Sequence, residues 1–380
     1  MSAGNRVLYV INDAPFFLSH RLALAQAAQA EGYDVHVAAP LTPEASVISQ
    51  KGLHFHPLPI NRKGLYVWEE IRSIISLYRL YTSLRPALVH HVTIKPVLYG
   101  GLMARLTAVP AVVSGVTGLG FVFISRGPKG LFLRTVVSRL YRVALRHSNS
   151  RVVFQNPEDR DTFVRGGLVD PSSAVLIKGS GVDMMTFAPS PEKPGTPLVV
   201  LGGRLLWDKG VGEYVEAARH LRKAGVNARF VLVGESDRGN PAAVPRSKLE
   251  EWHRSGVVEW WGYHNDMPAL IAESHVVCLP SYREGVPKFL IEGAACGRPI
   301  VATDVPGCRE IVENENNGLL VPPRDWRALA DALRRLIADP QLRERMGRRG
   351  RELAVSGFSL EKVVGETLAL YRELLQNVGG

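Results

Sequence analysis

Short, almost wholly apolar runs alternate with segments of helical periodicity along the whole chain. In the first half such runs predict strands at 6–11, 34–39, 54–58, 87–91, 111–116, 151–154 and 174–177. Between them, segments such as 68–84 and 130–146 carry apolar residues at helical spacing. Strands that are apolar on both faces and separated by helices indicate βα units, and hence a parallel sheet covered on both sides.

The second half repeats this scheme, with strands expected at 197–202, 229–233, 257–261, 276–280, 300–303 and 319–321. Between the halves, 188–197 holds four prolines in ten residues and suits neither a helix nor a central strand. We therefore predict an α/β fold of two Rossmann-like, doubly wound domains, at 1–187 and 198–357, joined by this linker. Open sheets of this kind bind ligands at the carboxyl ends of their strands, so a cleft between the domains is expected.

Composition excludes several classes of protein. The 380 residues are 46% hydrophobic and 22% charged, which suits neither a disordered chain nor a bundle embedded in a membrane. The three cysteines, Cys278, Cys296 and Cys308, lack CxxC spacing, so neither a disulfide framework nor a multi-cysteine zinc site is expected. The first apolar run, 7–11, is too short for the core of a signal peptide, and a cytoplasmic location is expected.

The net charge of +10 is distributed unevenly. Residues 1–190 hold 20 basic and 11 acidic side chains, and 71–157 holds twelve basic residues and no carboxylate. Such asymmetry favours a polyanionic partner, either a nucleic acid, an anionic membrane surface or a phosphorylated substrate. A solvated basic face is the alternative.

Two loops carry residues suited to a polyol that bears phosphate. Glu284 precedes a helix expected to open near Pro287, and Glu292 lies eight residues further on. A carboxylate accepts hydrogen bonds from hydroxyls, and a helix start attracts an anion. In the earlier loop, Arg204 and Lys209 follow a strand that ends in two glycines, and two cations at such a turn form a natural diphosphate clamp.

As a set, these motifs resemble family 4 glycosyltransferases, which are retaining, metal-independent enzymes of the GT-B fold. The resemblance rests on Gly203-Arg-Leu-x3-Lys-Gly210, Glu284-Gly-x6-Glu292, Gly297-x-Pro-Ile-Val-Ala-Thr303 and Gly318-Leu-Leu-Val321. In the first half, 90–96, 117–120 and 178–183 resemble a bacterial subgroup that extends polyprenyl-diphosphate-linked sugars in O-antigen, capsule or glycan assembly. That subgroup includes N-acetylgalactosaminyltransferases that act on undecaprenyl-diphosphate-linked bacillosamine.

The resemblance implies roles for individual residues, and no cofactor or metal beyond a nucleotide-sugar donor, expected to be UDP-linked. Arg204 and Lys209 would hold the diphosphate, Glu292 the ribose, and Glu284 the transferred sugar, an N-acetylhexosamine such as GalNAc or a hexose. The base would bind near Tyr263. The remaining donor-side candidates are Gly203, Glu235, Gly285, Val286, Pro287, Lys288 and Phe289. The final helix, within 360–380, would pack back on the first domain.

The acceptor side departs from the family's pattern. Many members carry a Gly-Gly pair in the first loop, where this chain has 12–20, and a histidine after the fifth strand, where it has Thr117. The sugar-facing histidine therefore has no counterpart. The acceptor-side candidates are Asn12, His20, Lys95, Thr117 and Gly118.

The segment 130–146 also predicts a basic amphipathic helix. Leu133, Val136, Val137, Leu140 and Ala144 share one stripe, while Arg139, Arg142 and Arg146 share another, with Lys129 just before. Such a helix can lie on anionic lipid, so we expect peripheral association with the inner face of the cytoplasmic membrane. A core-packed helix with solvated arginines is the alternative.

Other functions fit the sequence less well. A nonhydrolysing UDP-sugar 2-epimerase would share the fold, but its catalytic carboxylates are not recognisable. A noncatalytic nucleic-acid-binding or regulatory module is suggested by charge alone. Asp159-Arg-Asp161 spells a metal–diphosphate motif, yet after Asn156 it is better interpreted as the capped first turn of a helix.

Overall fold

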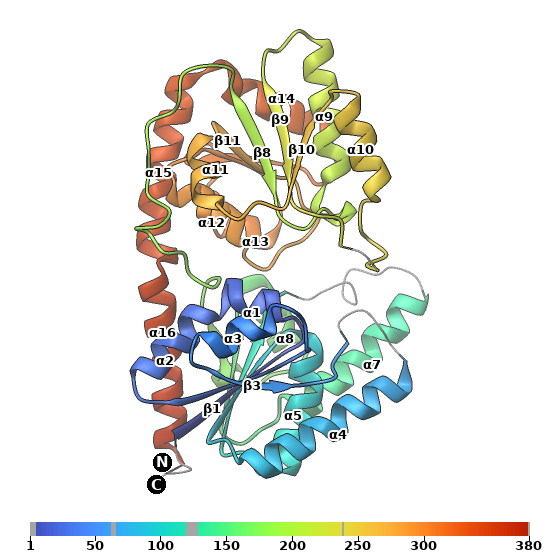
Figure 1. The fold of residues 1–380 in the computed structure, drawn as a ribbon, viewed down its shortest axis with the longest axis vertical. Helices are drawn as coiled ribbons and strands as arrows, with labels where there is room; N and C mark the ends of the chain where they lie inside the picture. The colour runs from blue at the N-terminus through green and yellow to red at the C-terminus, as the bar shows by residue number, and fades with distance from the viewer. Residues whose placement is uncertain (1–4, 62–65, 119–127, 238, 379–380) are drawn as a thin grey trace. The chain divides into compact units, whose positions relative to one another are not determined.

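The computed structural model describes residues 5–61, 66–118, 128–237 and 239–378. The chain divides into two compact units, one formed by Met1–Ser180 with Lys362–Gly380 and the other by Gly181–Glu361 (Figure 1). Both contain a parallel sheet covered by helices, which confirms the α/β fold of two Rossmann-like parts.

The first unit holds a seven-stranded sheet in the order β3-β2-β1-β4-β5-β6-β7. Every strand expected from the sequence is present within a residue or two of its predicted bounds. The strands are β1 Arg6–Ile11, β2 Asp34–Ala39, β3 His54–Pro57, β4 Leu88–Val92, β5 Ala111–Val116, β6 Ser150–Phe154 and β7 Ala174–Leu176.

Helices cover both faces of this sheet. They are α1 Ala14–His20, α2 Leu22–Ala30, α3 Ala45–Gln50, α4 Val67–Leu84, α5 Gly101–Leu106, α7 Pro128–Ala144, α8 Pro157–Arg165 and α16 Leu360–Gln376. Because side chains alternate along a strand, Tyr9 packs with Leu368 and Leu374 of α16 on one face. On the other face Leu8 packs with Leu77 of α4. The last helix of the chain thus completes the core of the first unit.

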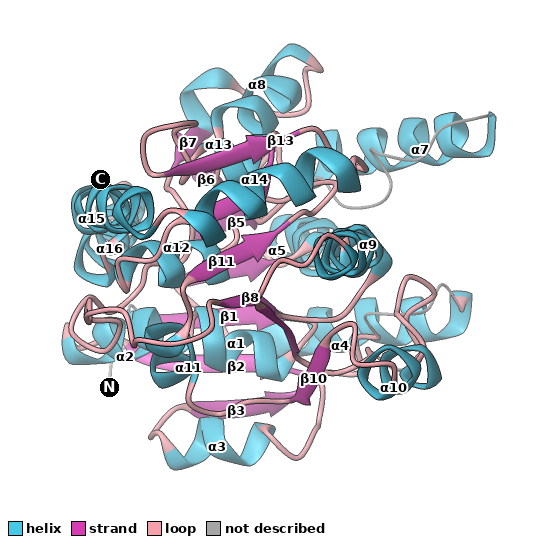
Figure 2. Ribbon diagram, turned by 90° about the horizontal axis from the view of Figure 1, so that it is seen from above, coloured by secondary structure: helices cyan, strands magenta, loops and turns pink. Residues whose placement is uncertain are grey.

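The second unit holds a six-stranded sheet in the order β10-β9-β8-β11-β12-β13. Its strands are β8 Leu198–Gly202, β9 Arg229–Val233, β10 Glu259–Gly262, β11 Val276–Leu279, β12 Ile300–Thr303 and β13 Gly318–Val321. Its helices are α9 Val211–Lys223, α10 Arg246–Arg254, α11 Met267–Glu273, α12 Lys288–Ala295, α13 Pro306–Arg309, α14 Trp326–Ala338 and α15 Pro340–Phe358. The helices lie on both sides of the sheet, as the view from above shows (Figure 2).

The proline-rich segment 188–197 contains no helix or strand but packs within the second unit. Arg343 donates from Nη2 to Glu192 at 2.8 Å, and Arg298 donates to the Ser190 hydroxyl at 3.0 Å. The change of unit comes earlier, between Ser180 and Gly181.

Candidate functional site

In the second unit the donor-side candidates gather where neighbouring strands end. Strands β9, β8 and β11 are adjacent, and the loops that follow them carry Glu235, Arg204 and Glu284. The loops are locked together by close backbone contact. A Cβ atom on Gly234, whose φ is +134°, would lie 1.8 Å from the carbonyl oxygen of Gly203, so only glycine fits there.

Lys209 and Glu284 form an ion pair at this edge of the sheet, Nζ donating to Oε1. Their side chains are only 23% and 10% exposed, so the pair is largely shielded from water. The next residue, Gly210, has φ +72° and is the N-cap of α9, and a Cβ there would lie 2.1 Å from the carbonyl oxygen of Pro280. The lysine loop therefore sits directly against the loop that carries Glu284.

Arg204 is more open than Lys209. Its side chain is 49% exposed, and Nη1 lies 3.3 Å from Oδ2 of Asp237. Gly203 donates its backbone N–H to Val233 at 3.0 Å, which holds the start of the arginine loop against β9. The guanidinium thus stays accessible to a ligand on a loop whose backbone is fixed.

Glu292 lies on α12 and is 8% exposed. Lys288, one turn earlier, places Nζ 3.2 Å from Oε1. Burial raises the pKa of the Glu292 carboxyl, and the neighbouring ammonium group of Lys288 opposes part of that rise. A buried carboxylate with one cationic partner retains acceptor capacity for a hydroxyl ligand.

The other donor-side candidates fall into two groups. Val286 and Phe289 are buried, and the Phe289 ring packs so closely on Gly202 that a Cβ there would lie 2.6 Å away. Only their backbone groups are suited to ligand binding. Pro287 precedes the first residue of α12, as the sequence predicted. Tyr263 is 73% exposed, beside β10.

In the first unit the acceptor-side candidates lie after β1, β4 and β5. Asn12 accepts a 2.7 Å hydrogen bond from the hydroxyl of Thr93, which adopts φ +77°, a strained conformation for a β-branched residue. Lys95 is engaged by the carboxylate of Glu70 and the carbonyl of Asn61.

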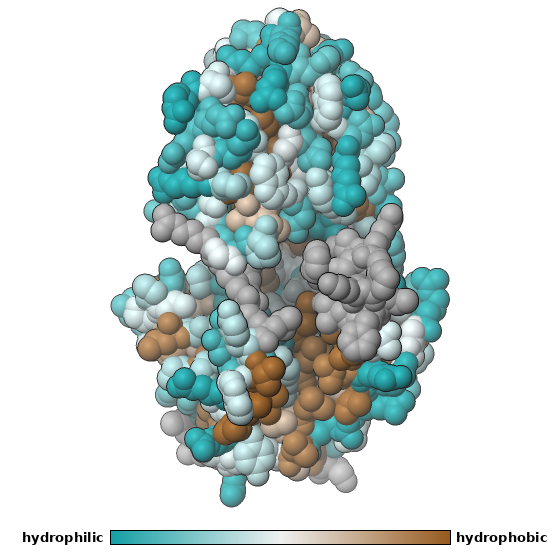
Figure 3. All heavy atoms as spheres, turned by 90° about the vertical axis from the view of Figure 1, so that its right-hand side faces the viewer, coloured by the Kyte–Doolittle hydropathy of each residue, from teal (hydrophilic) through white to brown (hydrophobic). Residues whose placement is uncertain are grey.

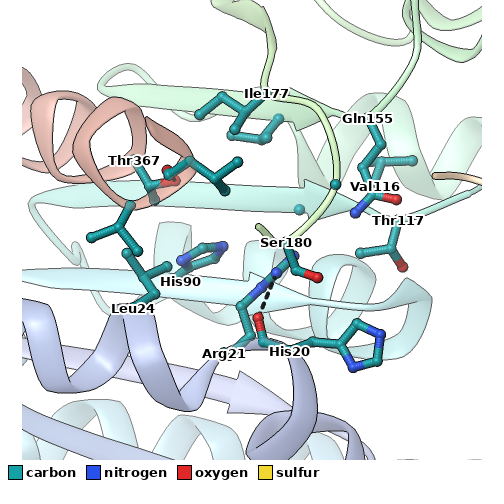
Figure 4. Close-up of a pocket in the computed structure, with 15 residues that line it drawn as sticks. His20, Arg21, Leu24, His90, Val116, Thr117, Gln155, Ile177, Ser180 and Thr367 are labelled. Atoms are coloured by element: carbon teal, nitrogen blue, oxygen red, sulfur yellow. Dashed lines mark hydrogen bonds between the residues drawn. The ribbon is translucent and has the colours of Figure 1, made fainter. Parts of the chain in front are cut away.

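His20 and Thr117 line one pocket, shown in Figure 4, together with buried His90. The ring of His20 stacks on Phe16 with centroids 4.0 Å apart. Gly118 follows with φ +140°. The structure therefore brings two of the five acceptor-side candidates to a common cavity.

Four further polar residues line this pocket and were not among the site candidates: Arg21, Gln155, Ser180 and Thr367. Arg21 is 8% exposed and donates from Nη1 to the carbonyl oxygen of His20 at 3.0 Å. Gln155 directly follows β6, a position at the ligand-binding edge of such sheets that is a usable signal. For Arg21 the only available signal is its place next to His20, between two helices.

His90 and His91 point to opposite faces of the sheet, as consecutive strand residues must. His90 contacts the hydroxyl of Tyr371 through Nδ1 at 2.5 Å, and His91 contacts that of Tyr81 through Nε2 at 2.8 Å. Burial lowers the pKa of both rings, that of His91 to about 3. Both are therefore neutral at physiological pH.

The DxD sequence serves as a helix start. Asn156 caps α8 by accepting the backbone N–H of Asp159 at 2.8 Å, and Asp159 is itself buried. This confirms the capping interpretation. Within the described part of the chain, no group of three or more His, Cys, Asp or Glu side chains is placed to hold a metal ion.

Comparisons with known proteins agree with this arrangement. The family model described as Glycosyl transferases group 1 matches residues 185–353, and that described as Glycosyl transferase 4-like matches 6–156. The chain is 27% identical to N,N'-diacetylbacillosaminyl-diphospho-undecaprenol alpha-1,3-N-acetylgalactosaminyltransferase of Campylobacter jejuni, over 95% of this chain and 99% of that protein. It is 30% identical to alpha-D-kanosaminyltransferase of Streptomyces kanamyceticus, over 73% of this chain and 74% of that protein.

Solved structures share the fold. Sucrose-phosphate synthase from Thermosynechococcus elongatus superimposes with a TM-score of 0.82 at 20% identity, over 98% of this chain and all of that one (100%). Anabaena HepE in complex with UDP-glucose gives a TM-score of 0.75 at 19% identity, over 96% and 99% of the two chains.

Proposed function

Because the chain belongs to the group 1 glycosyltransferases, we propose that it moves a sugar from a UDP-sugar to a polyprenyl-diphosphate-linked saccharide during assembly of a bacterial surface polysaccharide or glycan. The Campylobacter relative and an Escherichia coli alpha-1,3-galactosyltransferase, 27% identical over 84% of this chain and 84% of that protein, are both named for undecaprenol-linked diphospho-sugar acceptors. The solved complex of HepE with UDP-glucose, similar in fold, supports the donor class.

One observation carries the donor assignment: the shielded Lys209–Glu284 pair, with Arg204 on the same loop as Lys209. When the glycosidic bond breaks, its electron pair passes to an oxygen of the leaving UDP. Fixed cations at that oxygen lower the barrier without rearranging. We assign this role to Arg204 and Lys209, with Glu284 accepting hydrogen bonds from the sugar and Glu292 from the ribose.

Retention of configuration and independence of metal ions belong to the same proposal. In it, the acceptor hydroxyl attacks the face from which UDP departs, and a departing phosphate oxygen takes its proton. The charge on the leaving diphosphate is met by the guanidinium of Arg204, the ammonium of Lys209 and the start of α12. The expected donor sugar is an N-acetylhexosamine such as GalNAc, or a hexose.

The test is a panel of UDP-, GDP- and ADP-sugars with an undecaprenyl-diphosphate-linked saccharide, assayed with and without EDTA. We expect transfer from a UDP-sugar that EDTA leaves unchanged, and an α linkage by NMR if the donor is α-linked. Arg204→Ala should lose most turnover, whereas Arg246→Ala, an exposed arginine paired with Glu250, serves as the matched control. Conversion of a UDP-sugar to its 2-epimer without acceptor would instead identify an epimerase.

We also propose that the first unit binds an anionic membrane surface. None of the helices that the structure describes is long and apolar enough to cross a membrane. Helices α4 and α7 lie toward one side of this unit, with α5 in contact with both. Figure 3, which views that side, shows apolar side chains at the surface among polar ones.

The outward face of α4 is apolar at helical spacing. Its exposed residues include Trp68 (80%), Ile71 (39%), Ile75 (45%) and Tyr78 (46%). Arg72 and Arg79 line a surface groove together with Trp68, Ile71 and Ile75. No ion pair of either arginine is found in the described part of the chain. An apolar stripe flanked by arginines suits the boundary between lipid headgroups and acyl chains.

Helix α7 presents a similar face, although its apolar stripe is divided. Ala144 is buried and Val137 partly buried, whereas Val136 and Leu140 are exposed. The side chains of Arg139 and Arg146 are exposed, and Arg142 donates to the carbonyl of Gly167 at 3.0 Å. Leu133 and Lys129 belong to α7, but their side chains lie outside the described residues.

Cosedimentation with vesicles tests this surface. Phosphatidylglycerol vesicles should retain the protein at low salt and release it at high salt, and phosphatidylcholine vesicles should not retain it. Each surface cation contributes about 1 kcal/mol, so Arg72→Gln with Arg79→Gln should weaken binding roughly tenfold or more. Trp68→Ser should also weaken it, whereas Val355→Ser, an exposed apolar residue of the second unit, should not. Equal binding to both vesicle types would rule out electrostatic association.

A further inference from the structure

Arg21 is a buried cation without a carboxylate partner. It follows the last residue of α1 and precedes the first of α2, and it is 8% exposed. Its Nη1 donates to the carbonyl oxygen of His20 at 3.0 Å, and Nε has no hydrogen-bond partner. No ion pair of Arg21 is present within the described ranges. A buried charge in this state is costly, because the hydrogen bonds that it makes to water in the unfolded chain are only partly replaced.

The groups around Arg21 do not neutralise it. The hydroxyls of Tyr9 and Tyr371 lie 3.0 Å apart, and burial raises the pKa of both, so they stay uncharged. His90, whose Nδ1 contacts Tyr371, has a pKa lowered by burial and by Arg21 itself. Tyr9, Tyr371 and His90 are therefore neutral, while a guanidinium stays protonated.

The arginine lines a narrow pocket together with other polar groups. Figure 4 shows its guanidinium near Ser180, with Thr117 and Gln155 on the opposite wall. Thr117 and Gln155 follow β5 and β6, at the edge of the sheet where ligands bind. The free space inside is about 20 Å3, enough for one oxygen-sized group and not for a whole phosphate.

We propose that Arg21 forms an anion subsite in which one oxygen of a phosphoryl group enters this pocket and pairs with the guanidinium. The hydroxyls of Thr117 and Ser180, which line the same pocket, are suited to donate to this group. A ligand oxyanion supplies the charge that the protein lacks, and an arginine–phosphate pair is among the strong charge-assisted contacts. We assign this phosphoryl group to the diphosphate of the lipid-linked acceptor, an assignment that rests on the proposed function.

The first test is direct binding of inorganic pyrophosphate by calorimetry in the presence of saturating UDP. UDP occupies the cations of the second unit, so remaining pyrophosphate binding reports another site. We expect Arg21→Gln to weaken this binding at least tenfold and Arg21→Lys to weaken it less. Arg105→Gln, which removes an arginine bonded to the Val143 carbonyl, is the matched control and should change nothing.

Thermal unfolding separates a ligand-binding role from a structural one. If the role of Arg21 is to bind an anion, the Arg21→Gln variant should unfold at the same or a higher temperature than wild type in anion-free buffer. Pyrophosphate should then stabilise wild type only. A merely structural arginine would give the reverse, with lower stability in every buffer. Absence of UDP-resistant pyrophosphate binding in wild type overturns the proposal without any variant.

Steady-state kinetics then identify the source of the phosphoryl group. Arg21→Gln should raise KM for the undecaprenyl-diphosphate-linked acceptor at least tenfold and leave KM for the UDP-sugar within twofold. An unchanged acceptor KM with normal transfer refutes the assignment to the acceptor while the proposed function stands. If pyrophosphate binding depends on Arg21 but no sugar is transferred to any lipid-linked acceptor, the anion subsite is supported and the proposed function is refuted.

Discussion

Replacing Leu374 with alanine should destabilise the first unit although the residue is six positions from the end of the chain. Leu374 is fully buried on α16, and it belongs to the same apolar cluster as Val7 and Val35 of the sheet. Its loss removes about 2–3 kcal/mol of transfer free energy, and the cavity raises the total to about 3–4 kcal/mol. For a unit of this size we expect a fall in Tm of roughly 6–16 °C.

Hydrogen exchange resolved by peptide is the appropriate assay, because it reports each unit separately. Protection should fall in β1, β2 and α2, and peptides of β8 and β11 should keep theirs. Leu375→Ala is the control, since Leu375 is only partly buried on the same helix, and it should cost about 1 kcal/mol or less. Loosening confined to 198–356, or equal effects of the two substitutions, would show that α16 does not complete the first core.

Three further predictions concern charged and titratable groups. Glu292→Ala should weaken UDP binding about tenfold, because a hydrogen bond to a charged acceptor is worth about 1.5–3 kcal/mol; calorimetry with UDP decides, and wild-type affinity would contradict the ribose role. His91 is protonated in the unfolded chain below a pKa of about 6.5, and its pKa falls to about 3 in the fold. Its contribution to stability is therefore present above pH 6.5 and is lost as pH falls from 6.5 toward 3, by up to about 1.4 kcal/mol per pH unit. Denaturant titrations at several pH values give the unfolding free energy of wild type and His91→Gln, and this free energy should change less steeply with pH in the variant. Lys209→Met should lower kcat more than Arg204→Ala, because Lys209 is the more buried of the two cations; equal or reversed losses in stopped-time assays would count against that ranking.

Strand positions followed from the sequence because most strands are buried on both faces. Runs such as 276–279 are apolar throughout and fully buried, as expected of a parallel sheet covered on both faces. The sequence also singled out Lys209 and Glu284 separately, each by its own loop. Their ion pair joins residues 75 positions apart and depends on the adjacency of β8 and β11, which local pattern does not encode.

Other features of the sites lay beyond sequence pattern. Periodicity placed Val136, Val137 and Leu140 on one helical stripe, but it does not distinguish a face that meets the core from one that meets solvent or lipid. The burial of Arg21 and the strained φ of Thr93 both arise from tertiary packing around the strand ends. The sequence around an arginine between two helices does not predict that its side chain is buried.

The two places where the chain changes unit are bonded to each other. Val182 donates its N–H to the carbonyl of Phe358 at 3.0 Å, and Leu360 donates to the carbonyl of Val182 at 3.0 Å. The second unit therefore leaves and rejoins the first through two neighbouring strands of backbone, in the manner of a domain inserted into a host. Segment 181–361 therefore has the connectivity of an inserted domain. Exchanging it between relatives would replace the half that we propose binds the donor. Both ends of the host, and the core that α16 completes, would still come from one protein.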